Sequence, residues 1–484
     1  PYPYRAPKRN SGAWGGGGST QLPDDLAEAL AALLEVLEGV EAGAGRREQH
    51  DLARLGGGGG PRHRLLEVGA AAQGAYVRPR DGGQHWIRDS KTLLPALKKI
   101  RFFDEKSGWA AGSASAMYPS GVFQTDSGGR SWSPLIGAKP QGWAAADLID
   151  PHTGAVAGLD GAAAIVRRGS ISPCQSPSFG LRGVHDLRLV PPVYGMLVGQ
   201  GGLIMVTPDL GMTWQSPSGE LPFGLAGQFD LRALEIRGTQ CWVAGSPGTR
   251  IFHTPDAGRT WQAAATGQNL PIQSITFVDQ QHGWAVGQLG TILASVDGGQ
   301  TWTRQRSGGT RAALLGLFSR PEDIPLELFA RLSGDEGYLG VVEVLNRQDL
   351  ESPSRSDVRS ADRAHEAVVG VGGSAVETAW RFPLRQPGLK LSFDQVVASW
   401  DRANDGRGRQ ELEAHLVRQI RLWRPEVIVT HDTDPLRDDL RPIPQKFQAA
   451  HAVGDETAID VGRRVGDAVG EQAGVGCRVG LIRQ

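Results

Sequence analysis

The fold is decided by Thr207-Pro-Asp209-Leu-Gly211-Met-Thr213-Trp214 and by two near copies of this stretch further along the chain. The copies are Thr254-Pro-Asp256-Ala-Gly258-Arg-Thr260-Trp261 and Ser295-Val-Asp297-Gly-Gly299-Gln-Thr301-Trp302, and all three fit the pattern Ser/Thr-x-Asp-x-Gly-x-Thr-Trp. Weaker copies end at Trp86 and Trp132, and the second of these has its acidic residue displaced by one position. Internal repetition of this kind predicts a repeat architecture, and it outweighs any local signal.

The spacing of the copies predicts the size of the repeat. The terminal tryptophans at 86, 132, 214, 261 and 302 are 46, 82, 47 and 41 residues apart, and 82 is twice 41. One unit without the motif is therefore expected between 132 and 214. This unit is visible in 142–143, 154–158 and 162–166. Each unit also carries an upstream strand of the form Gly-Trp-Ala-x-Gly, as at 108–112, 241–245 and 283–287, with 195–199 as a variant. A period of 41 to 47 residues with three or four short strands predicts an all-β propeller. We count six blades, with a seventh left open.

The residue types of the motif predict a structural role. On a hairpin turn an Asp accepts backbone N–H groups, a Gly supplies positive φ, and a Trp fills the space between neighbouring blades. We therefore expect these residues to stabilise turns and to contact no ligand. The structural set is Asp209, Gly211, Trp214, Asp256, Gly258, Trp261, Asp297, Gly299 and Trp302.

The repeat resembles the Asp-box of bacterial-neuraminidase-type (BNR) repeats, which also occur in sialidases. A sialidase site needs an arginine cluster with a Tyr/Glu pair, and no such pair is found among the six tyrosines. Together with the Gly-Trp-Ala-x-Gly strands, residues 62–308 resemble most closely the photosystem II stability/assembly factor family. The resemblance implies a non-enzymatic propeller that binds membrane-protein assembly intermediates through an arginine-rich face. Candidates for such a face are Arg167, Arg168, Arg182 and Arg188.

After Gly308-Gly309 the pattern changes to strands that alternate with helical stretches, which predicts an α/β Rossmann-like domain. Strands are expected at 312–318, 337–345 and 424–432, and helices at 325–332 and 411–423. An acidic turn, Ser319-Arg320-Pro321-Glu322-Asp323, follows the first strand.

Residues 311–435 resemble the LmbE/PIG-L family of zinc-dependent N-acetylglucosamine deacetylases. That family implies an Ala-His-Pro-Asp-Asp segment after the first strand and a downstream His-Pro-Asp-His segment. Here Arg320 stands in place of the metal-binding His, and Asp434–Leu440 contains no His. A guanidinium stays protonated and cannot ligate zinc, so a degenerate domain is predicted. The alternative is a rearranged site with Glu322 as base and with Asp323 and His431 as metal ligands. Glu322 and Asp323 also have a structural interpretation, as acids at a helix N-terminus.

Composition narrows the function classes. With 51 Lys+Arg against 52 Asp+Glu the net charge is -1, so no basic field favours a nucleic-acid partner. No run approaches the 18 or so apolar residues that a membrane span requires, and no signal peptide is visible.

The three cysteines are far apart, which disfavours a disulfide scaffold or a zinc site, and they are expected to be buried thiols. His365, His415 and His451 are expected to be ordinary histidines. The chain begins with Pro1 and can lack its native N-terminus, so its compartment stays open, with a bacterial cell envelope favoured by resemblance.

The expected organisation has four parts. Residues 1–61 form a Gly-rich tail with one helix near 24–38, 62–310 the Asp-box propeller, 311–450 the LmbE/PIG-L-like domain and 451–484 an unassigned tail. The leading interpretation is a non-enzymatic scaffold that holds a protein partner on its propeller face without a cofactor. The alternative is a zinc-dependent N-acetylglucosamine-type deacetylase with altered ligands.

Overall fold

The computed structural model describes residues 94–138, 142–176, 178–222, 226–309, 311–347, 360–383, 393–431 and 477–481, together with four short strands between 50 and 88. The helix expected near 24–38, the segment 434–440 and His451 lie outside the described residues. The chain divides into two compact units, Pro1–Ala42 and Gly43–Gln484. Everything described below belongs to the second unit.

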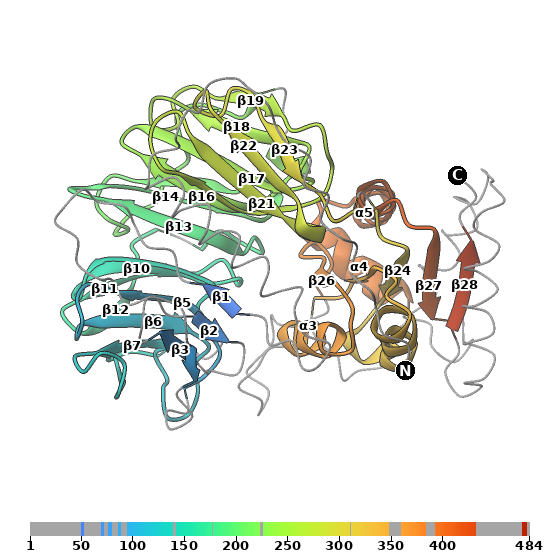
Figure 1. The fold of residues 1–484 in the computed structure, drawn as a ribbon, viewed down its shortest axis with the longest axis horizontal. Coiled ribbons are helices and arrows are strands. Elements are labelled where there is room, and N and C mark those ends of the chain that lie inside the picture. The colour runs from blue at the N-terminus through green and yellow to red at the C-terminus, as the bar shows by residue number, and fades with distance from the viewer. Residues whose placement is uncertain are drawn as a thin grey trace, which may run out of the picture. The chain divides into compact units, whose positions relative to one another are not determined.

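Six antiparallel sheets follow one another along the described residues between His50 and Arg306 (Figure 1). Five have four strands, and the sheet β13–β15 has three. The strands are β1 His50–Leu52, β2 Gly69–Ala71, β3 Tyr76–Pro79 and β4 Trp86–Arg88; β5 Leu97–Phe102, β6 Gly108–Gly112, β7 Val122–Thr125 and β8 Ser133–Pro134; β9 Ala145–Asp150, β10 Thr153–Ala157, β11 Ala163–Arg167 and β12 Ser170–Pro173; β13 Val184–Val190, β14 Tyr194–Gly199 and β15 Ile204–Thr207; β16 Asp230–Arg237, β17 Gln240–Ser246, β18 Arg250–Thr254 and β19 Gln262–Ala265; β20 Ile272–Phe277, β21 Gly283–Gly287, β22 Ile292–Ser295 and β23 Thr303–Arg306.

Within each sheet, strands that are consecutive in the chain are neighbours, as in the blade of a β-propeller. This agrees with the expected repeat class. The Gly-Trp-Ala-x-Gly segments form the second strand of their sheets at β6 and β21, and β17 contains the equivalent segment. The interval between Trp132 and Trp214, where a unit without the motif is expected, contains the sheet β9–β12. Strand β1 lies within the segment 1–61, for which only a tail with one helix is expected.

The C-terminal part is built on a five-stranded sheet in the order β26-β25-β24-β27-β28. Its strands are β24 Leu314–Phe318, β25 Gly340–Val344, β26 Ala375–Thr378, β27 Val427–His431 and β28 Cys477–Leu481. The first four are mutually parallel, and β28 is antiparallel to β27 at the edge. Strand β28 falls in the segment 451–484, for which the sequence offers no assignment.

Helices cover both faces of this sheet. One core contains the buried side chains of α4 Phe393–Ala403 and α5 Gly408–Trp423, among them Trp400 and Trp423. The other contains those of α2 Leu326–Phe329 and α3 Ser360–Gly370, among them Phe329 and Val368. Because successive residues of a buried parallel strand point to opposite faces, β24 contributes Leu315 to the first core and Phe318 to the second.

The first of these cores also includes a residue of the antiparallel region. Leu270, just before β20, is 2% exposed and clusters with the side chains of α4 and α5. Asn269 donates a side-chain hydrogen bond to the carbonyl of Leu422. The N–H groups of Gly308 and Ala312 donate to the carbonyls of Leu289 and Trp423. The two regions therefore share an apolar core, through Leu270, and a side-chain hydrogen bond, through Asn269, where the sequence pattern changes.

Candidate functional site

The aspartates of the three motif copies bond within their own turns. The carboxylate of Asp209 accepts hydrogen bonds from Thr207 Oγ1 at 2.9 Å, from Thr213 N at 2.8 Å and from Thr213 Oγ1 at 2.7 Å. Asp256 makes the equivalent set with Thr254 and Thr260, and Asp297 makes it with Ser295 and Thr301. We call these three hairpins the motif turns. Their acceptor atoms are engaged by the protein itself, which is the arrangement that a structural role predicts.

The hydrogen bonds also hold the acids ionised. Burial alone would raise the pKa of Asp209, but the hydrogen bonds from Thr213 and Thr207 outweigh it and the pKa lies below its ordinary value of 3.8. The same balance lowers the pKa of Asp297. For Asp256 the hydrogen bonds from Thr260 dominate, and the pKa falls to about 2. None of the three is poised to exchange a proton near neutral pH.

The first residue of the motif has a role that the sequence interpretation missed. Thr207 Oγ1 accepts the N–H of Gly211 at 2.7 Å, and Thr254 and Ser295 do the same for Gly258 and Gly299 at 2.8 Å. The three glycines have φ of 93°, 91° and 85°. A hydroxyl at this position is therefore needed to close the loop around the left-handed glycine.

The weaker copy ending at Trp132 shows how the displaced acid is replaced. Ser127 stands where the other copies have Asp, and its Oγ accepts the N–H of Ser131 at 3.0 Å and bonds Ser131 Oγ at 2.9 Å. Thr125 Oγ1 accepts the N–H of Gly129 at 3.0 Å, as the first motif residue does elsewhere. Asp126 is exposed beside this turn. A hydroxyl thus replaces the carboxylate.

The motif tryptophans pack between sheets. Trp214, Trp261 and Trp302 are 5%, 8% and 8% exposed, and each shares a core with side chains of its own sheet and of the preceding one. Two of the motif glycines also lie directly against the preceding sheet, since a Cβ on Gly299 would be 2.5 Å from Trp242 Nε1 and a Cβ on Gly211 would be 2.6 Å from Ala155 Cβ. Both residue types therefore join adjacent sheets.

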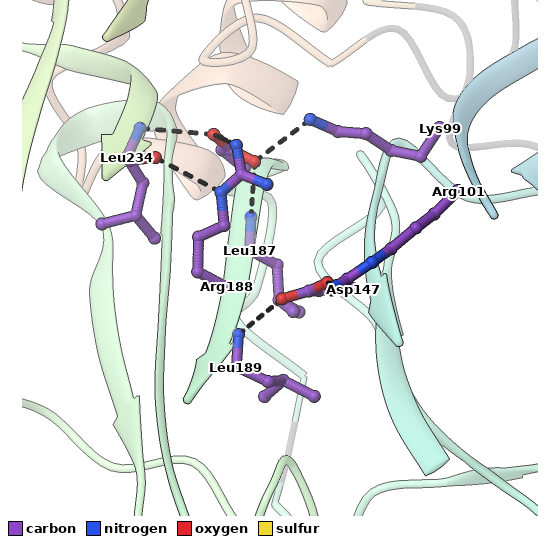
Figure 2. A network of polar contacts seen from close by, with 8 residues as sticks. Lys99, Arg101, Asp147, Leu187, Arg188, Leu189 and Leu234 are labelled. Carbon is purple, nitrogen blue, oxygen red and sulfur yellow. Dashed lines mark hydrogen bonds and ion pairs between the residues drawn. The ribbon is translucent and has the colours of Figure 1, made fainter. Parts of the chain in front are cut away.

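A network of charged side chains links the first strands of four consecutive sheets (Figure 2). Lys99 of β5 pairs with Asp186 of β13 at 3.3 Å, and Arg101 of β5 pairs with Asp147 of β9 at 3.1 Å. The two acids also accept backbone N–H groups of the next first strand, Asp147 from Leu189 at 2.8 Å and Asp186 from Leu234 at 3.3 Å. Both carboxylates are 9% exposed. Each acid therefore connects its own sheet to the following one.

The signs of the charges alternate from sheet to sheet. In each first strand we compare the residue that pairs with the second position of the Gly-x-x-x-Gly strand. These residues are Arg101, Asp147, Arg188, Glu235 and the uncharged Thr276. The pKa of Arg188 is raised, mainly by Asp186 and further by Asp147 and Glu235. The network is thus internally neutralised, which suits a structural core better than an anion site.

The four arginines expected to form a binding face do not share one. Arg167 and Arg168 are exposed at the turn between β11 and β12, whereas Arg182 lies against the opposite end of β11, near Gly161. Arg188 belongs to the charge network and donates to the carbonyl of Leu234 at 3.4 Å. The sequence could not reveal this, because opposite ends of a strand are only a few residues apart in the chain.

The residues of the deacetylase-like alternative lie at the carboxyl ends of two neighbouring strands of the C-terminal sheet, β24 and β27. Glu322 and Asp323 belong to the turn Pro321–Asp323 after β24, where Glu322 is exposed and Asp323 half-buried. His431 ends β27, the parallel neighbour of β24, and its side chain lies outside the described residues. Arg320 directly precedes the turn. Across the described ranges, no group of three His, Cys, Asp or Glu residues has metal-site geometry.

A buried acid in the same sheet was missed from the sequence. Glu343 of β25 is 1% exposed and its Oε1 lies 2.8 Å from His415 Nε2 on α5. Burial raises the pKa of Glu343, and His415 offsets part of this effect. His415 therefore partners a buried carboxyl. An acid within an otherwise apolar strand is the signal that could have identified it.

The segment Glu377–Arg381 contacts the antiparallel region through four side-chain interactions. Arg232 Nη1 and Nη2 donate to the two carboxylate oxygens of Glu377 at 2.7 and 2.5 Å. Trp380 Nε1 donates to Asp230 Oδ1 at 3.2 Å, and this oxygen also accepts the N–H of Gly201 at 2.7 Å. Arg381 Nη2 donates to the carbonyl of Gly227 at 3.2 Å, and its guanidinium lies 4.5 Å from the Trp380 ring centroid.

Further side-chain contacts join the antiparallel region to the C-terminal part of the chain. Arg347 donates to the carbonyls of Leu159 and Leu181, and Lys98 pairs with Asp362 at 3.3 Å.

Of the three cysteines expected to be buried thiols, Cys241 is buried, Cys174 is half-buried and the side chain of Cys477 is not described. No helix in the described ranges is long and apolar enough to span a bilayer.

Comparison with known proteins identifies relatives of the antiparallel region. Residues 181–275 match the family model "Photosynthesis system II assembly factor YCF48". The photosystem II assembly lipoprotein Ycf48 of Synechococcus sp. (strain CC9902) is 29% identical over 119 residues, which is 24% of this chain and 35% of that protein. The chain thus spans about a third of that relative. A structure of YCF48 bound to D1 peptide is 18% identical, with 50% of this chain and 79% of that chain covered at a TM-score of 0.40. YCF48 from Cyanidioschyzon merolae is 14% identical, with 55% and 89% covered at 0.40.

Proposed function

We propose that this chain is a non-catalytic scaffold that holds a protein partner on its β-propeller. The observation that carries the proposal is the match of residues 181–275 to the photosystem II assembly factor model. The matched residues form the sheets β13–β15 and β16–β19, and their two motif turns close on their own hydrogen bonds. The relative solved with a D1 peptide suggests a protein or peptide as the class of partner.

We further infer that the six described sheets are blades of one propeller and that their turns are Asp-boxes of the BNR type. The C-terminal strand order places β24 and β27 side by side between the two wings of a doubly wound sheet, which supports a Rossmann-like assignment. Association with a bacterial cell envelope is proposed from the lipoprotein relative.

The deacetylase alternative gains no support from the geometry. Zinc would supply a polarised amide and an activated water, and Asp323 and His431 are the residues that would hold it. Arg320 instead brings a permanent positive charge into the turn that would contribute the first ligand. We therefore propose that the LmbE/PIG-L-like domain is degenerate and acts in binding or in structure.

Site-specific crosslinking in the source organism tests the proposal. A photoreactive amino acid would replace Val193 or Val296, which are 50% and 69% exposed on turns of the sheets, and Val417 of α5, 37% exposed, as the control. We expect one defined protein to crosslink at a sheet position, to be absent from the Val417 control, and to co-purify stoichiometrically with the unmodified chain. Absence of any stoichiometric protein complex, together with acetate release from N-acetylglucosamine conjugates, would refute the scaffold and favour the enzyme.

A further inference from the structure

The contacts that Glu377–Arg381 makes with the antiparallel region resemble those of a peptide bound in a preformed recognition site. The Arg232–Glu377 pair is bidentate, and its side chains are only 14% and 19% exposed. Bidentate guanidinium–carboxylate pairs fix geometry as well as charge and are typical of carboxylate recognition. Arg232 thus recognises an acidic side chain at one defined position of the bound segment.

A second feature recognises the indole. Gly201 has φ of 61°, and a Cβ there would lie 2.4 Å from Trp380 Cζ2, so the ring occupies space that only glycine leaves open. Asp230 accepts both the indole N–H and the N–H of Gly201, which orients the ring against this backbone. The surface therefore selects an aromatic donor three residues after the acid.

The recognition groups and their occupant come from different regions of the chain. Gly201, Gly227, Asp230 and Arg232 all lie within residues 181–275, the part that matches the assembly factor model. The occupant belongs to β26 and the turn after it, and β26 is an edge strand that pairs with β25 alone in the described sheet. Its side chains can leave the surface without breaking pairing inside the sheet.

We propose that Gly201, Gly227, Asp230 and Arg232 form a recognition site for a peptide of the type Glu-x-x-Trp, and that Glu377–Arg381 fills it in cis. This rests on the proposed function and specifies the partner as one that carries an acidic and an aromatic residue three positions apart. A tethered segment acts at millimolar effective concentration, so the partner competes only when it binds more tightly or through additional contacts.

Peptide binding to the full-length chain tests this site. The probe is a fluorescein-labelled peptide with the sequence of residues 374–383, and the control peptide has Glu replaced by Gln and Trp by Ala. A Glu377→Gln/Trp380→Ala chain, which has lost its own occupant, should bind the probe in fluorescence anisotropy at least tenfold more tightly than the wild-type chain. Adding Arg232→Ala to that variant should weaken binding tenfold or more, and the control peptide should not bind.

Two outcomes would overturn the proposal. One is a folded Glu377→Gln/Trp380→Ala chain that does not bind the probe, and the other is binding that Arg232→Ala leaves unchanged. If the variant no longer unfolds cooperatively, the site is tested on the wild-type chain instead. Millimolar probe peptide should then displace residues 374–383 of the chain and accelerate their hydrogen exchange, and unchanged exchange would refute the site. Partner crosslinking at Val193 or Val296 without peptide binding would remove this site but leave the scaffold standing.

Discussion

Replacing Asp209 by Ala should destabilise the protein, because three hydrogen bonds of its turn lose their acceptor. The lost donors are Thr207 Oγ1, Thr213 N and Thr213 Oγ1, at 2.9, 2.8 and 2.7 Å. At a net value of about 1 kcal/mol each, and with water replacing part of the interaction at this half-buried turn, we expect a loss of about 2 to 3 kcal/mol. For a folding unit of roughly 200 residues this corresponds to a fall in Tm of about 4 to 12 °C.

The chain provides its own matched controls. Asp126→Ala removes an acid from the equivalent turn where Ser127 makes the bonds, so its effect should stay within about 0.5 kcal/mol. Ser127→Ala should destabilise the protein where Asp126→Ala does not. Asp209→Ser should lose less stability than Asp209→Ala, because a hydroxyl reproduces part of the acceptor set.

The assay is thermal unfolding followed by circular dichroism, combined with partner binding by the folded fraction. We expect the Tm to fall for Asp209→Ala and binding by the folded molecules to persist. Equal melting of Asp209→Ala, Asp126→Ala and the wild type, together with lost binding in Asp209→Ala alone, would show that the carboxylate serves a ligand and would refute the structural interpretation.

Three further predictions concern other parts of the chain. Burial lowers the pKa of His253 below its ordinary value of 6.5, with Asp256 offsetting part of the effect, and both ring nitrogens are buried without a hydrogen-bond partner in the described structure. The unfolded chain therefore takes up this proton first, stability should fall as pH drops below about 6.5, and His253→Phe should flatten that dependence in urea titrations. Leu270→Ala should cost about 2 to 5 kcal/mol and increase hydrogen exchange in α4 and α5, because Leu270 completes their core; unchanged exchange there would contradict the shared core. The purified chain should contain substoichiometric zinc and release no acetate from N-acetylglucosamine conjugates; one equivalent of tightly bound zinc, with acetate release that Asp323→Ala abolishes, would establish the enzyme.

The antiparallel repeat was predictable because its turns depend on local chemistry. A left-handed glycine, a side-chain acceptor and a bulky apolar residue must recur at fixed offsets, and that recurrence is visible in the printed sequence. The role of Ser127 was not predictable in the same way, since a search for Asp reads Asp126 as a displaced acid and overlooks the hydroxyl beside it.

The charge network and the Glu377–Arg381 contacts were not predicted, because both depend on the distance in space between remote segments. Arg232 and Glu377 are 145 residues apart, and each alone resembles an ordinary surface charge on an alternating strand. A weak signal did exist for the network. Its members precede the second residue of the Gly-x-x-x-Gly strand by eight positions in Arg101, Asp147 and Arg188, and by seven in Glu235.

The alternating charges of the first strands have a consequence for how similar repeats find their places. Repeat proteins risk misassembly, because one unit can pack beside the wrong neighbour when all units resemble each other. Arg101, Asp147, Arg188 and Glu235 occupy equivalent positions with alternating sign. A sheet that skipped one place during folding would face a like charge at the equivalent position of its neighbour and would lose the carboxylate that accepts its backbone N–H. We therefore expect the network to favour the correct order of the sheets during folding over an order in which one sheet is skipped.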